Sequence, residues 1–313
     1  MANTILPNEA RPDLSVGLSK RALAGAATMI APVIFPAFTV REKAGTIACA
    51  KVIRGTGTKN RAKGTALVGT RVEPEDITYS VNKYEGREIL DDSEIKDAGG
   101  LDNALAAASR WAGYDAIALL EGDAHAALNN AAAPGEAVAV IDPDKPFDFL
   151  FVAAQTVKDY GRPVLVCSES FIRKFVSFPG VASVLTDLFG HGWFKDIRAG
   201  GDLENVQAAL GSAFGLSGVV IGDDRFWTDE NDAWVVGYRP EAQTDARSVV
   251  KRLPSLGFMP VFLPEDASSL EEPFAVSTAY LPNTKDNAVD TTLYAVPKVI
   301  NHEAVARVSI TTH

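Results

Sequence analysis

The stretch ITYSVNKYEGREILDDSEIKDAGG, residues 77–100, decides the fold of this chain. Its first half carries the β-branched and aromatic residues that are typical of a strand, and its second half is an acidic turn. An Ala-rich segment follows from Leu101 to Ala133, and alanine is the best helix former. We therefore expect a strand, an acidic turn and one long helix, which at 1.5 Å per residue would span roughly 45 Å.

The predicted long helix has a recognisable buried stripe and a recognisable end. Residues that recur near helical spacing predict the stripe, with Trp111 and Ile117 beside it: Leu101, Leu105, Ala108, Ala112 and Leu119. The segment is expected to end at Asn129-Asn130, before Pro134-Gly135.

The segment before residue 77 predicts two strands joined by a long tip. The outgoing strand is expected at Thr46–Ile53, and the return strand at Thr65–Val72, where Glu73-Pro74 would stop it. The tip, Arg54–Gly64, holds no apolar side chain larger than alanine and cannot bury itself. Such a flap needs a partner surface.

Charge divides this region into two blocks of opposite sign. Residues 41–71 hold eight Lys/Arg and one acid, a net charge of +7. Residues 72–102 hold ten acids and three bases, a net charge of −7. Complementary patches steer association and fix register, whereas two separately solvated faces would explain the same counts. Under the first interpretation, basic residues of the flap contact acids of an adjacent subunit: Arg54, Lys59, Arg61 and Lys63 against Asp91, Asp92, Glu94 and Asp97.

The rest of the chain predicts an arm, a compact unit and terminal strands. Residues 1–37 form the arm, in which Ser19–Ile30 is expected to be helical, Ala31-Pro32 to end that helix and 33–36 to be extended. Residues 146–270 alternate strand and helix patterns, with strands expected in 163–167, 219–222 and 233–238 and helices in 169–178 and 202–214. Residues 272–313 return to strand patterning.

Composition limits the class of protein. The 313 residues carry a net charge of −10, which argues against a simple nucleic-acid binder. Two cysteines cannot form a disulfide framework, so a reducing cytosol is the default compartment. The early apolar run at 22–38 is too short and interrupted to span a membrane, and residues 1–7 lack the pattern of a signal peptide.

A search for catalytic, cofactor or metal sites finds no convincing constellation. The histidines form no metal-binding pair; His125 is expected to have a surface or packing role rather than to bind a ligand, and His191 is expected to have a role in a loop. Gly55–Lys59 lacks the order of a phosphate loop. Asp91-Asp92 and Asp223-Asp224 are expected to serve turns or helix starts rather than a cation. Cys49 and Cys167 are expected to be small buried hydrophobes. We predict no enzyme and no cofactor.

The order of these segments resembles the major capsid proteins of tailed phages. Four stretches carry the resemblance over nearly the whole chain: Ile34–Gly45, Tyr79–Asp92 with the helix that holds Glu121, Val164–Pro179 and Phe214–Gly222. The resemblance implies the α+β Hong Kong 97-like capsid fold, shared with herpesviruses. It also implies an N-terminal arm (1–37), an extended β-hairpin loop (38–75), a peripheral domain with a spine helix (76–145 plus 272–313) and an α/β axial domain (146–271).

The function implied by the resemblance is a shell of hexamers and pentamers around double-stranded DNA, located in the virion and assembled in the host cytoplasm. Partners of that class are a separate scaffold, a portal and decoration proteins, with no membrane and no sequence-specific DNA contact. Some relatives cross-link a loop lysine, and we predict no cross-link here. Two alternatives stay open: an encapsulin-type compartment shell and a soluble cytosolic α/β enzyme that uses residues 146–270.

Overall fold

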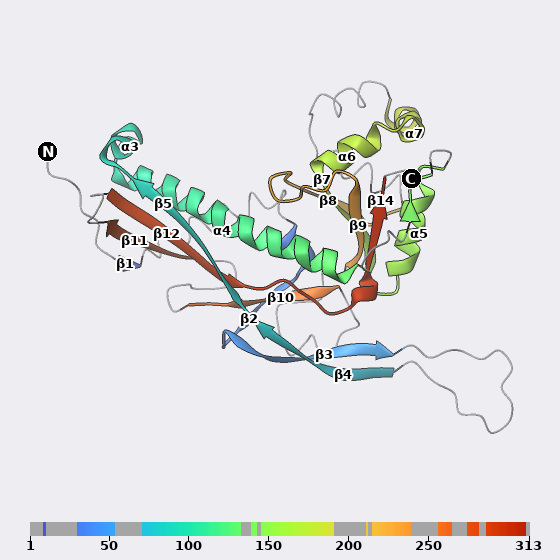
Figure 1. Ribbon diagram of the computed structural model, residues 1–313, viewed down its shortest axis with the longest axis horizontal. Coiled ribbons are helices and arrows are strands. Elements are labelled where there is room, and N and C mark those ends of the chain that lie inside the picture. The colour runs from blue at the N-terminus through green and yellow to red at the C-terminus, as the bar shows by residue number, and fades with distance from the viewer. Residues whose placement is uncertain are drawn as a thin grey trace.

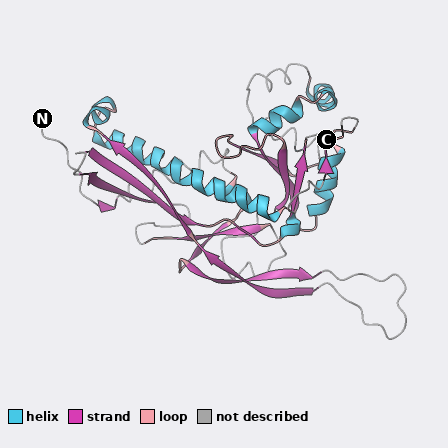
Figure 2. Ribbon diagram, in the orientation of Figure 1, coloured by secondary structure: helices cyan, strands magenta, loops and turns pink. Residues whose placement is uncertain are grey.

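The computed structural model describes residues 9–10, 30–53, 71–132, 139–142, 145–190, 211, 215–238, 256–264, 274–281 and 286–310 (Figure 1). Helices and strands are mixed in this part of the chain, and the strands form one large sheet, one smaller sheet and a hairpin (Figure 2). The expected α+β class is confirmed.

The larger sheet has seven strands drawn from both ends of the chain. Its order is β1-β11-β12-β10-β13, with β2 beside β10 and β5 beside β12. The strands are β1 (Glu9–Ala10), β2 (Ala37–Val40), β5 (Asn82–Leu90), β10 (Gly257–Phe262), β11 (Ala275–Leu281), β12 (Asp286–Ala295) and β13 (Lys298–Val299). Strands β5 and β12 pair antiparallel from Asn82↔Ala295 to Leu90↔Asn287. A strand pair of this length offers a platform for the long helix.

The predicted long helix is confirmed as α4 (Leu101–Ala131), which lies along β5 and β12 after the short helix α3 (Asp92–Asp97) (Figure 1). Gly86 of β5 allows an exceptionally close approach, because a Cβ at this position would lie 1.8 Å from the carbonyl oxygen of Ala112. The alanines of α4 and this glycine therefore act together, since both remove side-chain bulk between helix and sheet.

The buried face of α4 differs from the predicted stripe at one residue. Leu105, Ala108 and Ala112 are buried as expected, but Leu119 is 54% exposed and Leu120 is buried instead. The reason is a change of partner: the first half of α4 lies on the sheet, whereas Glu121 and the residues after it meet α2 and the β8–β9 loop. The buried face shifts around the helix axis where the partner changes.

The hairpin consists of β3 (Ala44–Ile53) and β4 (Arg71–Ser80), paired antiparallel from Ala44↔Ser80 to Ile53↔Arg71. It extends away from the body as a separate two-stranded sheet (Figure 1). The expected return strand was wrong, because β4 continues through Glu73-Pro74 to Ser80, with Pro74 opposite Ala50. Proline is tolerated on an edge strand, where its missing N–H removes no ladder bond. Residues 54–70, which include the tip, lie outside the described part.

The smaller sheet has the order β6-β14-β9-β7-β8. Its strands are β6 (Ala139–Val140), β7 (Arg162–Ser168), β8 (Gly218–Gly222), β9 (Asp232–Tyr238) and β14 (Val305–Ser309). Three helices, α5 (Asp148–Val157), α6 (Glu169–Val176) and α7 (Pro179–Phe189), contribute to the core on one face, and a 3-10 helix, η3 (His302–Ala304), precedes β14. The strands predicted near 163–167, 219–222 and 233–238 are confirmed.

Two hydrophobic cores meet at this sheet because its strands alternate. Val166 and Trp234 face the core shared with α4 and the larger sheet, whereas Leu165 and Val235 face the core under α5, α6 and α7. Every residue of the alternating pattern is buried on one side or the other. The smaller sheet is therefore joined to the rest of the molecule through one continuous core.

Near the arm, the structure differs from the prediction. Ala31-Pro32 was expected to end a helix, but α2 (Ala31–Ile34) begins there, because a proline in the first turn lacks only an N–H that would have no partner within the helix. The expected helices at 19–30 and 202–214 fall almost entirely outside the described residues. Strand β10 lies in the larger sheet and β14 in the smaller one, although the proposed domain boundaries assign them the other way; the boundaries themselves stay a prediction.

The contact between Gly86 and α4 yields a matched pair of substitutions. Gly86→Ala should destabilise the chain by about 3 kcal/mol or more, because the new methyl group meets rigid backbone rather than a side chain that can move. Gly122 lies on α4, and a new Cβ there would have no atom within 4 Å, so Gly122→Ala should stabilise the chain by about 1 kcal/mol. Urea unfolding of both variants measures the difference, and equal effects would contradict the close approach.

Candidate functional site

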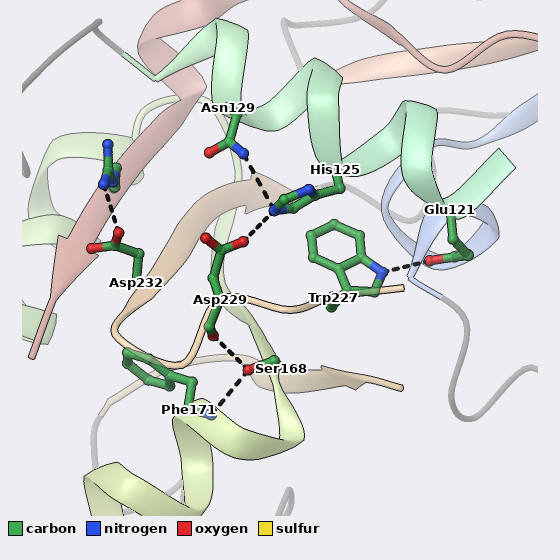
Figure 3. A network of polar contacts seen from close by, with 9 residues as sticks. Glu121, His125, Asn129, Ser168, Phe171, Trp227, Asp229 and Asp232 are labelled. Carbon is green, nitrogen blue, oxygen red and sulfur yellow. Dashed lines mark hydrogen bonds and ion pairs between the residues drawn. The ribbon is translucent and has the colours of Figure 1, made fainter. Parts of the chain in front are cut away.

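The main polar site of the described residues is a buried carboxylate, that of Glu121 on α4. The side chain is fully buried and accepts three hydrogen bonds, of which Figure 3 draws the one from Trp227. The backbone N–H of Ile30 donates to Oε2 at 3.0 Å, that of Ala31 to Oε1 at 2.9 Å, and Trp227 Nε1 to Oε2 at 2.8 Å. One side chain therefore ties together the start of α2, the long helix and the loop between β8 and β9.

Burial controls the ionisation of this carboxyl group. Removal from water raises the pKa of Glu121, and the donors from Trp227, Ala31 and Ile30 offset only part of that effect. A buried carboxylate without these donors would be strongly unfavourable. Gly222 makes the arrangement possible, since a Cβ at this position would lie 2.5 Å from Trp227 and 2.6 Å from Ile30.

One turn further along α4, His125 holds the same β8–β9 loop. Its Nε2 contacts the carboxylate of Asp229 and lies 3.3 Å from Asn129 Nδ2 (Figure 3). The edges of Trp227 and Trp234 meet the imidazole, with ring centroids 5.0 and 5.1 Å away. The expectation that His125 packs rather than binds a ligand agrees with this geometry.

The β8–β9 loop is also fixed to the smaller sheet and to α6. Ser168 Oγ donates to the carbonyl oxygen of Asp229 at 2.6 Å and accepts from Phe171 N at 2.9 Å as the N-cap of α6. Asp224 accepts from Ser170 N at 2.9 Å, and Asp232 pairs with Arg307 at 2.5 Å. The loop therefore carries the connection from α4 to α6 and β14.

This arrangement is a structural joint. Glu121 is enclosed by N–H donors, and burial raises the pKa of the Cys167 thiol, as expected for an inert buried cysteine. The Asp223-Asp224 pair serves the loop, because Asp223 accepts from Arg225 N at 2.9 Å while Asp224 serves α6. Among the residues that the structure describes, no group of three or more His, Cys, Asp or Glu could hold a metal ion.

The four predicted acidic contact residues lie at and around α3. Asp91 is its N-cap and accepts from Ser93 N and Glu94 N, both at 2.8 Å, while Glu94 Oε2 accepts from Asp91 N at 3.0 Å. The bonds from Ser93 and Glu94 lower the pKa of Asp91, so the group is ionised at neutral pH. Asp92 begins α3, and Asp97, at its end, is exposed. Asp91 and Glu94, which cap the start of α3 through each other's backbone N–H groups, both remain exposed on the surface.

Two acids that the sequence interpretation did not pair belong to the same surface. The pKa of Glu88 is raised mainly by its partial burial and secondly by the nearby charges of Glu94 and Asp115. We call Glu88, Glu94 and Asp115 the acidic cluster; its members come from β5, α3 and α4. Neighbouring Lys83 and Arg87 pair elsewhere, with Glu85 and Asp290. Only the fold brings Asp115 beside the other two, which is why their spacing along the chain did not indicate it.

The basic half of the predicted contact cannot be placed. Arg54, Lys59, Arg61 and Lys63 all lie outside the described residues, as do Gly55–Lys59 and His191. The hairpin that leads toward them is described up to Ile53 and from Arg71. Whether these bases meet Asp91, Asp92, Glu94 and Asp97 of a second copy stays a prediction. No described helix has the length and apolar character needed to cross a membrane.

Comparison with known proteins identifies the fold. No protein-family model and no curated sequence matches the chain. A phage-related protein from Bordetella bronchiseptica aligns over 97% of this chain and 97% of its own, with 15% identity and a TM-score of 0.61. A virus-like particle from Pyrococcus furiosus aligns over 96% and 97%, with 13% identity and a TM-score of 0.51. The chain has the tailed-phage major capsid fold, as the sequence resemblance predicted.

Removing the Glu121 side chain should destabilise the fold strongly. Glu121→Ala leaves three buried N–H donors without an acceptor and opens a cavity, so we expect a loss of about 3 kcal/mol or more in the free energy of unfolding. Asp115→Ala, an exposed acid on the same helix, should change it by less than about 0.5 kcal/mol. Denaturant titration compares them; a mild effect of Glu121→Ala would contradict its role as the joint.

The raised pKa of Glu121 predicts a pH dependence with a definite sign. The folded chain keeps a proton on this carboxyl at pH values where the unfolded chain, with an ordinary pKa of about 4.3, has lost it. The free energy of unfolding should therefore fall as the pH rises from the ordinary value through the raised one. Glu121→Gln should remove this component. Urea titrations of both proteins across that range test it, and parallel pH profiles would contradict the prediction.

Proposed function

We propose that this chain is the subunit of a self-assembling icosahedral shell, the major capsid protein of a tailed phage. In this proposal the subunits form hexamers and pentamers around double-stranded DNA. The observation that carries it is the combination of the capsid fold with a hairpin of ten paired residues that extends beyond the body. A long unpaired edge strand is a liability in an isolated protein. In a shell, the same hairpin has neighbours to contact.

The joint at Glu121 suits a subunit that must transmit contacts without deforming. Glu121, His125 and Ser168 hold the β8–β9 loop from the side of α4 and from the side of α6. The two sheets also share one hydrophobic core. A shell subunit that contacts its neighbours through both sheets needs such a rigid connection, because a flexible one would leave the curvature of the shell undetermined.

Charge supports the partner that we propose for the flap. The acidic cluster gathers three carboxylates on the described surface, and the residues 54–63 carry four bases and no acid. We propose that Arg54, Lys59, Arg61 and Lys63 of one copy lie on the acidic cluster and on Asp91, Asp92 and Asp97 of the next. Burial, and after it the charges of Glu94 and Asp115, raises the pKa of Glu88, and a basic partner would offset the part that comes from those charges.

The net charge of −10 also fits a shell that encloses DNA without gripping it. The genome then touches no sequence-reading surface, and a separate scaffold, a portal and decoration proteins would be the remaining partners. The virion would be its location, after assembly in the host cytoplasm. The Pyrococcus furiosus virus-like particle shares the fold, so an encapsulin-type shell around a protein cargo is the second candidate.

Assembly of the purified chain tests the proposal directly. We expect megadalton icosahedral particles in electron micrographs and in light scattering coupled to size exclusion. Nucleic acid inside particles from infected or induced cells would support the phage capsid, and a protein cargo would favour the compartment. A discrete small oligomer under all conditions would overturn both and favour the soluble enzyme.

Exchange of charges tests the flap contact. Replacing Lys59, Arg61 and Lys63 by Glu should slow assembly by roughly tenfold or more at low salt, because charge pairs of this kind act mainly through the association rate. Adding Lys at Glu88, Glu94 and Asp115 in the same chain should restore it. Glu230→Lys, an exposed acid outside the cluster, is the matched control and should have little effect. Failure of the double exchange to rescue assembly would refute this pairing.

A further inference from the structure

Helix α5 presents an apolar surface that nothing in the described chain covers. The helix buries Leu150, Ala153 and Val157 against the smaller sheet. On its opposite side, Phe151 is 59% exposed and Val152 is 47% exposed. Large apolar side chains grouped on one outward face mark an interaction surface more often than single ones do.

The helical repeat places the neighbours of these two side chains. Asp148 lies three residues before Phe151, and Gln155 and Thr156 lie four residues after Phe151 and Val152, so all five share one outward face. We call these five residues the α5 face. Strand β6, which packs beside α5 at the edge of the smaller sheet, adds the exposed Val140.

The charges around the α5 face identify the kind of partner. Asp142, Lys145 and Asp148 lie at its start, and Lys158 and Asp159 at its end, so three anions face two cations. A chain with a net charge of −10 repels its own copies over most approaches, and this repulsion is weaker where the local charges nearly cancel. A nucleic acid would find no excess of positive charge to bind. Trp111 and Tyr114 of α4 are also exposed, but their surroundings are acidic, because Asp115 of the acidic cluster lies beside them on the same helix.

We propose that the α5 face docks against a second copy of this chain. The inference rests on the proposed shell function, and it adds a second, apolar contact that is independent of the charged contact of the flap. The flap contact involves α3, α4 and β5, whereas the α5 face belongs to the smaller sheet. Phe151 is the central anchor of this contact, and Val152 and Val140 extend it.

Two valines allow a matched test. Val152→Asp places a carboxylate in the proposed contact, and Val184→Asp makes the same change on α7, where the side chain is 39% exposed. Both positions are exposed, so both variants should fold; circular dichroism and urea titration check this. We expect Val152→Asp to raise the protein concentration needed for assembly by about tenfold or more, the effect of losing an anchor side chain. Val184→Asp should assemble like the unmodified chain.

The outcomes separate this inference from the proposed function. If the unmodified chain forms shells and Val152→Asp forms them equally well, the α5 face is not a contact between copies, and the shell function stands. If the unmodified chain forms only small oligomers, the shell function falls. Analytical ultracentrifugation of Val152→Asp then decides the inference: loss of the oligomers supports the contact, and unchanged oligomers overturn it.

Discussion

The carboxylate of Glu121 is the interaction on which the rest of the structure depends. A buried charge is costly, and it persists here because Ile30, Ala31 and Trp227 each donate an N–H to it. Those donors come from two segments that lie far apart in the chain, the start of α2 and the β8–β9 loop, and both segments also share a hydrophobic core with α4. Glu121 thereby holds three parts of the molecule together at one point: the start of α2, the middle of α4 and the β8–β9 loop.

Around Glu121, the two sheets form the packed interior of the molecule, and the surfaces that could contact other subunits lie outside it. The two sheets share a core, and the alternation within β7 and β9 lets the smaller sheet face that core and a second one. The surfaces available for contact lie outside: the hairpin beyond the body, the acidic cluster formed by β5, α3 and α4, and the α5 face on the smaller sheet. They differ in chemistry, since the acidic cluster is charged and the α5 face is apolar. Charge would steer the approach and apolar burial would hold the contact.

Sequence patterns predicted helices and strands well where a single propensity was strong, and they failed at prolines, which can either end an element or fit within it. Alanine content predicted α4 to within two residues, and β-branched runs predicted β7, β8 and β9. Pro74 was taken as a strand end, but it occupies an edge strand that tolerates it. Pro32 was taken as a helix end, but it lies in the first turn of α2. Both residues obey the chemistry of proline, and only the pairing partners determine which of its uses applies.

The sequence by itself determined the fold class, the long helix and the opposite charges of two adjacent blocks, because propensity, periodicity and charge are properties of neighbouring residues. Only the tertiary structure decided that Glu121 is a joint, that Asp115 joins Glu88 and Glu94, and that Leu119 is exposed while Leu120 is buried. Each of these depends on segments far apart in the chain. A buried carboxylate and an exposed one look alike in a sequence, since the difference lies in the donors and the solvent that surround them.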